Sequence, residues 1–295
     1  MKHLITFGCS WMFGAGCGYH EDMTREQYKS IVWSEDLANQ YSFRSLIAKK
    51  YGYEHLNFSI WKSSNQKQFR LAQRFFSSDK FKQLQKNAEE VVVLWGITST
   101  GRDEVFSNNN SQYMNFVIGG EHHPNASEKD ASEFFARNIY DHDHCVFELA
   151  NEMTHWNDYF SLLNIKNYWF DSFNHHDYTV NSPGAKKLAD TDPQRVNYLN
   201  TAKIDNMVIE HDHSRDLLSQ LAIMHGMDTF DRRYHSSAWA NDTDRLNFLV
   251  DKKILNPYSF HPTVRGHVEI AEFFDPIFNK KVDNKSEGIY TTHIA

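Results

Sequence analysis

Two side chains near opposite ends of this chain could together perform nucleophilic catalysis. Ser10 follows an apolar run at residues 4–7 and precedes a glycine-rich segment at residues 14–16. A serine hydroxyl becomes a nucleophile when a neighbouring base takes its proton, and histidine is the usual base. His261 stands just before the last expected helix. The sequence therefore predicts a Ser10–His261 pair, provided that the fold brings the two residues together.

The order of elements around these residues predicts a mainly parallel sheet. Apolar runs at residues 4–7, 54–59, 91–95 and 165–171 alternate with helical patterns, as is typical of α/β proteins. The run at 91–95 is the most hydrophobic, so we expect it at the centre of the sheet. The loops that follow parallel strands meet at one edge, where sites form in open α/β folds. Ser10 would lie at that edge.

Residues typical of helix ends locate two helices between the first three expected strands. A helix that begins near Phe43 should end at Gly52, because glycine readily adopts the left-handed conformation of a helix end. Ser64 is placed to cap a second helix, whose apolar residues at 69–76 repeat at helical spacing. These two helices would separate the first three strands.

Further helices are expected in the second half of the chain. A long helical tract covers about 130–163, and another helix covers about 214–225. Thr263 is the expected cap of the last helix. The residues that this helix should turn inward are Val268, Ile270, Ala271, Phe273 and Phe274.

Two stretches, near 101–129 and 172–250, interrupt the alternation. The first is rich in asparagine and glycine and predicts a loop or small excursion over the strand ends. Residues 172–207 are polar and irregular. We expect one domain over residues 1–280 with these two insertions, followed by a tail at 281–295 with little apolar periodicity.

Composition bounds the class of protein. The chain has 295 residues, 40% of them hydrophobic, and a formal charge of -7, which with no basic stripe argues against nucleic-acid binding. No apolar run approaches the length of a membrane span, and no signal peptide is visible. The three cysteines, Cys9, Cys17 and Cys145, form no disulfide framework and suit a reducing compartment. We therefore expect a cytoplasmic protein that binds neither nucleic acid nor membrane.

Two blocks of the sequence resemble the SGNH (GDSL) hydrolases. Residues 8–11, Gly-Cys-Ser-Trp, are similar to the Gly-Asp-Ser-Leu block of that family. Residues 259–263 with the Gly-His pair at 266–267 resemble the last block, which supplies the catalytic histidine. The resemblance extends over most of the chain and implies a three-layer α/β/α fold of the SGNH and flavodoxin-like kind. It also implies that Ser10 is the nucleophile and His261 the general base.

The interior blocks depart from the family pattern. Lys62 stands where the second block has glycine, so its amide could still donate to an oxyanion although its side chain would narrow the approach. Thr98 stands at the asparagine position of the third block, and its hydroxyl is a shorter donor. With the amide of Ser10, these would form the oxyanion hole. Arg102, in the same loop as Thr98, could replace the missing amide and would suit an anionic substrate.

The group that orients His261 is left open by the sequence. The family has an aspartate three residues before its histidine, and this chain has Tyr258 there. In serine proteases, the loss of the aspartate costs about 10⁴ in turnover. Asp171, Asp251 or a backbone carbonyl could take its place.

Other reactive residues have simpler interpretations. Cys9 is expected to be a small buried hydrophobic residue rather than a nucleophile, and His267 is expected to pack within its helix. Several His/Asp clusters resemble metal ligands, but adjacent residues on a helix point in different directions. We therefore expect surface histidines and no metal or other cofactor. These clusters are Asp141–His144, His211–His213, His122–His123 and His175–His176.

The favoured function is hydrolysis of a small ester or an acetylated or otherwise acylated carbohydrate, through an acyl-enzyme on Ser10. The main alternative is a non-catalytic SGNH-like protein that binds or assembles with others. A loose resemblance to SGNH-like proteins of tailed bacteriophages keeps a virus-associated role open, and a metal-dependent enzyme is a weaker third alternative. The sequence leaves open a protein partner or a homo-oligomer, and it does not identify the substrate.

Overall fold

A four-stranded parallel sheet organises the fold. The computed structural model describes residues 1–107, 112–117, 126–173, 176, 178, 181–201, 204, 206–208, 216–227 and 243–279. The strand order is β2-β1-β3-β6, and all three pairings are parallel, so the predicted strands and their parallel arrangement are confirmed. The strands are β1 (Lys2–Gly8), β2 (Tyr53–Asn57), β3 (Glu90–Ile97) and β6 (Lys166–Asp171).

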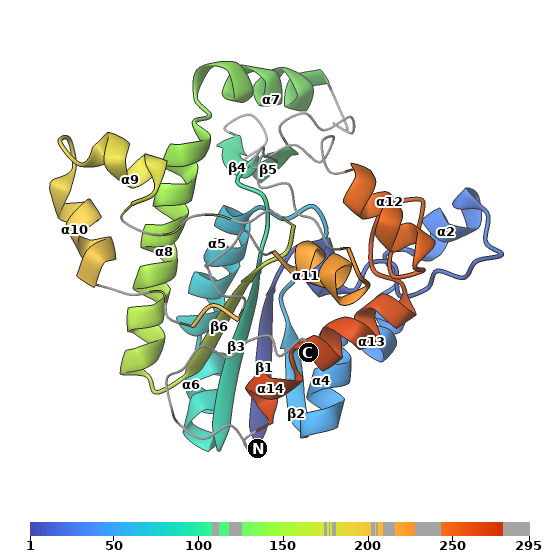
Figure 1. The fold of residues 1–295 in the computed structure, drawn as a ribbon. Helices are drawn as coiled ribbons and strands as arrows, with labels where there is room; N and C mark the ends of the chain where they lie inside the picture. Colours follow the sequence, from blue (N-terminus) through green and yellow to red (C-terminus); the bar gives the residue numbers. More distant parts are fainter. Residues whose placement is uncertain are drawn as a thin grey trace.

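Helices and one hairpin surround this sheet (Figure 1). Before β6 the chain forms α1 (Ser10–Phe13), α2 (Arg25–Ile31), α3 (Glu35–Tyr41), α4 (Phe43–Tyr51), α5 (Asn65–Phe76), α6 (Asp79–Asn87), β4 (Arg102–Ser107), β5 (Gln112–Val117), α7 (Ala126–Asn138) and α8 (His142–Leu162). After β6 it forms α9 (Pro183–Leu188), α10 (Pro193–Thr201), α11 (Leu217–Met224), α12 (Thr243–Asp251), α13 (Val264–Phe273) and α14 (Asp275–Phe278). None of the described helices has the length and apolar character that crossing a bilayer requires.

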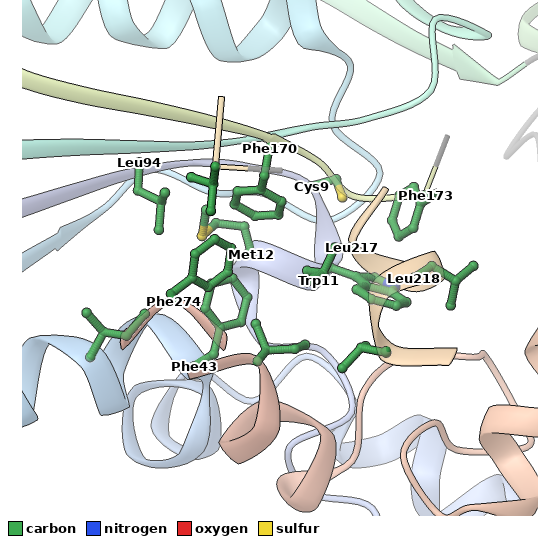
Figure 2. Packing of buried hydrophobic residues seen from close by; sticks show 14 of the residues in the cluster. Cys9, Trp11, Met12, Phe43, Leu94, Phe170, Phe173, Leu217, Leu218 and Phe274 are labelled. Atoms are coloured by element: carbon green, nitrogen blue, oxygen red, sulfur yellow. The ribbon is translucent and has the colours of Figure 1, made fainter. Parts of the chain in front are cut away.

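Alternate side chains of the central strands enter two separate apolar clusters. Leu4 and Leu94 pack with residues of α4, α11 and α13, and Figure 2 shows Leu94 near Phe43 and Phe274. Ile5 belongs to the other cluster, with residues of α5, α6 and α8. Because β3 is buried on both sides from residue 91 to 97, its sequence is continuously apolar rather than alternating.

Several predicted helix ends are confirmed. Ser64 Oγ accepts a hydrogen bond from the amide of Lys67 at the start of α5, and Thr263 Oγ1 accepts one from the amide of Gly266 at the start of α13. Gly52 ends α4 in the left-handed conformation. The inward face of α13 was predicted wrongly at one position, since Val268 is 39% exposed.

Other elements differ from the sequence predictions. The tract at 130–163 is two helices, because Asp141 ends the connection and caps α8 by accepting from the amide of His144. The stretch 101–129 contains the antiparallel β4–β5 hairpin, which Figure 1 shows with α7 above the carboxyl ends of the strands. Residues 172–207 contain α9 and α10, and α11 begins at Leu217. The predicted tail at 281–295 lies outside the described residues.

A short segment continues the sheet beyond β6. Met207 forms a parallel bridge with Trp169, whose amide donates to the carbonyl of Asn206 at 3.1 Å. The amide of Val208 donates to the Trp169 carbonyl at 2.8 Å, and the side-chain amide of Asn206 donates to the Asn167 carbonyl at 2.6 Å. The amide and carbonyl of Trp169 and the carbonyl of Asn167 are therefore satisfied by this segment.

Candidate active site

Ser10 lies at the carboxyl end of β1, as predicted. It is the first residue of the one-turn helix α1 and is 5% exposed. Its carbonyl accepts hydrogen bonds from the amides of Gly14 and Ala15 at 3.1 and 3.0 Å. Gly14 ends the turn with φ of 100°, a conformation that favours glycine. These contacts fix the backbone of Ser10 at the edge of the sheet.

His261 lies in a tight loop between α12 and α13. The loop is closed by an antiparallel bridge between Leu255 and Pro262. Asn256 donates twice to the carbonyl of His261, from its backbone amide at 2.9 Å and from its side chain at 2.8 Å. Phe260, directly before the histidine, has φ of 55°. The loop therefore positions the His261 ring through its neighbours on both sides.

A hydrogen-bond network around Nδ1 favours one tautomer of the His261 ring. Nδ1 lies 2.7 Å from Ser259 Oγ, which also lies 2.6 Å from the Tyr28 hydroxyl and 3.1 Å from Asn256 Oδ1. An amide oxygen only accepts, so the single Ser259 proton must point to Asn256. Tyr28 and Nδ1 of His261 must then both donate to Ser259. In the neutral ring, which the lowered pKa of His261 favours, this assignment leaves Nε2 without a proton, and Nε2 makes no hydrogen bond within the described residues.

Ser259 therefore takes the orienting position that the sequence analysis left open. Tyr258, which stands where the SGNH pattern has aspartate, instead donates its hydroxyl to the carbonyl of Met23 at 2.6 Å. Of the expected alternatives, Asp171 accepts from Tyr178 at 2.6 Å, and Asp251 is exposed. Neither carboxylate bonds to the His261 ring. Ser259 could have been found in the sequence because it stands two residues before His261. Tyr28, which completes the network, lies 231 positions from Ser259.

His261 is held neutral by its surroundings. Burial, together with the nearby positive charge of Arg102 and the ring of His267, lowers the pKa of His261 to about 3. The Trp33 ring packs edge-on against it, with the ring centroids 5.8 Å apart. The imidazole is therefore available as a base at neutral pH, although its affinity for a proton is low.

His267 has a structural role, in line with its interpretation from the sequence. It is fully buried in α13, stacks on Phe43, and accepts from the Phe43 amide through Nδ1 at 3.4 Å. Its Nε2 lies 3.4 Å from the carbonyl of Ala15. Both ring nitrogens of His267 thus contact backbone groups of other segments.

Lys62 lies in a turn after β2 that would suit glycine. The amide of Ser63 donates to the Ile60 carbonyl at 3.2 Å, and Lys62 at the third position has φ of 56°. Its side chain is exposed and places Nζ 5.3 Å from the centroid of the Trp61 ring. The lysine side chain thus lies on Trp61, whose ring stacks on Trp33 with the centroids 5.1 Å apart.

Replacing Lys62 by glycine is expected to raise the free energy of unfolding by up to about 1 kcal/mol, because the left-handed conformation is unfavourable for a residue with a Cβ. Urea denaturation of the two proteins measures the difference. Lys62→Ala keeps a Cβ in the left-handed conformation, so it is the control in which no rise in unfolding free energy is expected. Equal stability of the glycine and alanine variants would contradict the argument.

Thr98 is held by its backbone. The Asn65 side chain accepts from the amide of Thr98 and donates to its carbonyl, both at 2.9 Å. The backbone amide of Thr98 is therefore already used, whereas its Oγ1 is buried with no partner among the described residues. The hydroxyl is therefore the group of Thr98 that remains to bond with another group at this site.

Arg102 is the first residue of β4. Its guanidinium lies 5.7 Å from the centroid of the Phe173 ring. Cys9 is fully buried in an apolar cluster, and Figure 2 shows its sulfur beside Phe173. Arg102 and the residue that precedes Ser10 thus share Phe173 as a neighbour.

The sheet brings most of the predicted residues to one edge. Gly8 pairs with Gly96 in register, so Ser10 and Thr98 each follow two residues later on neighbouring strands. His261 packs against the segment that follows α1, since a Cβ added at Gly16 would lie 3.0 Å from Cβ of His261. Within the described residues, however, no hydrogen bond joins Ser10 to His261.

The histidine clusters outside this site form no metal centre in the described part of the chain. Nδ1 of His142 lies 3.1 Å from both the Thr100 and the Tyr140 hydroxyls. The sequence clusters at 211–213 and 122–123, and His175, lie outside the described residues. The grouping at residues 141–144 therefore includes a ring held by hydroxyl groups rather than by carboxylates.

No model of a known protein family matches the chain, and no curated protein matches it significantly. The function proposed below is therefore inferred from the residues and geometry described above.

Proposed function

We propose that this chain hydrolyses esters in an SGNH-like fold, with Ser10 as the nucleophile and His261 as the general base. The observation that carries the proposal is the network of Ser259, Asn256 and Tyr28, which leaves Nε2 of His261 unprotonated. A general base needs a fixed lone pair near the hydroxyl that it deprotonates. The neutral serine supplies the orientation that an aspartate supplies in related mechanisms.

In the proposed reaction, Nε2 of His261 takes the hydroxyl proton as Oγ of Ser10 attacks the ester carbonyl. The imidazolium then gives this proton to the leaving alkoxide, and an acyl-serine remains. Water, deprotonated by His261, hydrolyses the acyl-serine and regenerates Ser10. The amides of Ser10 and Lys62, which donate no hydrogen bond within the described residues, and the Thr98 hydroxyl are the proposed oxyanion donors.

The arrangement of the helices supports the fold part of this proposal. One apolar cluster joins the sheet to α4, α11 and α13, and the other joins it to α5, α6 and α8. Helices against both sets of sheet side chains are what a three-layer SGNH-like fold requires. The nucleophile would then stand at the carboxyl edge, where such folds place their sites.

Substitution of the nucleophile tests the proposal. The wild type is expected to hydrolyse 4-nitrophenyl acetate, and Ser10→Ala is expected to lower the turnover about 10³-fold because no acyl-enzyme can form. Ser77→Ala is the matched control, since Ser77 is exposed after α5 and distant in sequence from the site. Equal rates for the wild type and Ser10→Ala would contradict the assignment of Ser10.

A second function, a non-catalytic SGNH-like binding or virus-associated assembly protein, is favoured by one observation. Ser10 and His261 share no hydrogen bond within the described residues, and no carboxylate supports the imidazole. Absence of hydrolysis for several acyl esters, together with no labelling of Ser10 by an alkyl fluorophosphonate, would favour this alternative over the esterase.

A further inference from the structure

Buried polar atoms without partners gather at the carboxyl edge of the sheet. Native proteins satisfy nearly all of their buried donors and acceptors, so such exceptions mark places where a ligand or water belongs. Within the part of the chain that the structure describes, the unpartnered atoms at this edge are Ser59 Oγ, Thr98 Oγ1, Ser172 Oγ, Trp11 Nε1, and Nε and Nη1 of Arg102.

Arg102 is the unusual member because it carries a charge. Two other arginines reach the interior, and both are satisfied: Arg44 donates to the Phe13 carbonyl at 2.9 Å, and Arg245 forms an ion pair with Asp216 at 3.2 Å. Among the described residues, no carboxylate pairs with Arg102. An unpaired buried cation is costly, so its presence needs a compensating role.

The surroundings of Arg102 favour an anion. Two donor side chains contact Phe173, because the Trp11 ring packs edge-on against it at 5.0 Å and the Arg102 guanidinium lies 5.7 Å from its centroid. Indole and guanidinium nitrogens only donate, and the Thr98 and Ser172 hydroxyls can also donate. A group that satisfies this set must therefore supply acceptor oxygens and negative charge.

We propose that the ester substrate carries a carboxylate that binds Arg102. This inference rests on the proposed esterase function, and it adds the class of substrate. Arg102 and Cys9, the residue before Ser10, both lie beside Phe173, so the carboxylate would lie on the side of the sheet edge that holds the nucleophile. Charge-assisted bonds between guanidinium and carboxylate are among the strongest in proteins.

A bound carboxylate would also strengthen the base. The positive charge of Arg102 contributes to the lowered pKa of His261. A negative charge on the substrate offsets this effect, so His261 would bind a proton more readily in the complex than in the free protein. The substrate would in this way help to activate the catalytic pair.

Matched pairs of esters test the substrate class. Mono-4-nitrophenyl adipate and 4-nitrophenyl hexanoate differ by a carboxylate on the acyl side, and 4-acetoxybenzoate and its methyl ester differ by a carboxylate on the leaving group. The wild type is expected to prefer the anionic member of at least one pair by about 10- to 100-fold in kcat/KM. Arg102→Met is expected to abolish this preference, whereas Arg265→Met, at an exposed position in α13, is expected to keep it.

Two kinetic outcomes would overturn the inference. The wild type could show no preference in either pair. Alternatively, Arg102→Met could keep the preference of the wild type, and if it also slowed both members of each pair equally, Arg102 would be assigned to the oxyanion alone. No hydrolysis of any ester by the wild type would instead refute the proposed function.

A binding measurement separates the inference from catalysis. Adipate or 4-hydroxybenzoate is expected to raise the melting temperature of the Ser10→Ala protein, and to have no effect on the Ser10→Ala, Arg102→Met double variant. Arg102→Met without ligand is expected to melt no lower than the wild type, because it removes an unpaired buried charge. Absence of a shift with either carboxylate would overturn the inference even in an active esterase.

Discussion

The Asn256→Ala variant is expected to lose about 4 kcal/mol of unfolding free energy and nearly all hydrolytic activity. Asn256 is fully buried, and its side chain accepts from the amides of Tyr258 and Ser259 and donates to the His261 carbonyl. It also bonds to the hydroxyls of Ser259 and Tyr28. Truncation leaves several buried partners unsatisfied, and each costs about 1–3 kcal/mol without full additivity. Urea denaturation and the rate with 4-nitrophenyl acetate measure the two losses.

Ser259→Ala separates the stability of this loop from the orientation of the histidine. The variant keeps the backbone contacts of Asn256 but removes the acceptor of Nδ1 of His261. We expect a fall in kcat of about 100-fold with little change in KM, and partial rescue in Ser259→Thr, which keeps the hydroxyl. A Ser259→Ala protein with the turnover of the wild type would show that the network does not orient the base.

Lowering the pH from 7 to 5 is expected to cost the protein about 4 kcal/mol of unfolding free energy. His55, His261 and His267 each have a pKa lowered from 6.5 to about 3 by burial. Below pH 6.5 the unfolded chain binds protons that the native protein does not, so this stability is complete above pH 6.5 and is lost as the pH falls toward 3. Each group changes stability by about 1.4 kcal/mol per pH unit over that range.

One carboxyl group acts in the opposite sense. Burial raises the pKa of Asp171 from 3.8 to about 8, so the native protein keeps a proton that the unfolded chain releases. The stability that Asp171 contributes is lost as the pH rises toward 8. Its effect on the unfolding free energy offsets that of about one of the three histidines. The pKa of Asp216 is also raised by burial and acts in the same direction.

The slope of unfolding free energy against pH checks this balance. Urea denaturation between pH 4.5 and 6.5 should give a slope of about 3 kcal/mol per pH unit, equivalent to about two protons. His267→Gln removes one titrating group and should lower the slope by about one proton. This change in slope is expected even if the variant is less stable than the wild type at every pH. A flat profile over this range would contradict the native protonation states described here.

The strands were predictable because of their burial. A parallel strand covered on both sides must be apolar throughout, and β3 has this pattern from residue 91 to 97. The β4–β5 hairpin was missed because its segment, polar and rich in asparagine, has the composition of a loop. The break between α7 and α8 had a local signal in Asp141, whose capping role is common at helix starts.

The site was predictable only in part. The sequence placed Ser10 and Thr98 at one edge, because both follow buried strands. It did not find Ser259 as the partner of His261, because the expected pattern has an acidic residue at another position. Tyr28 lies on α2, an element absent from the sequence prediction, and its contact with Ser259 depends on the folding of distant segments.

The segment at residues 206–208 limits how copies of this chain could associate. Sheets commonly merge between molecules when an outer strand offers free amides and carbonyls to another chain. Asn206 and Val208 already occupy those groups on β6 at Trp169 and Asn167. Strand addition at this position would first require detachment of the segment.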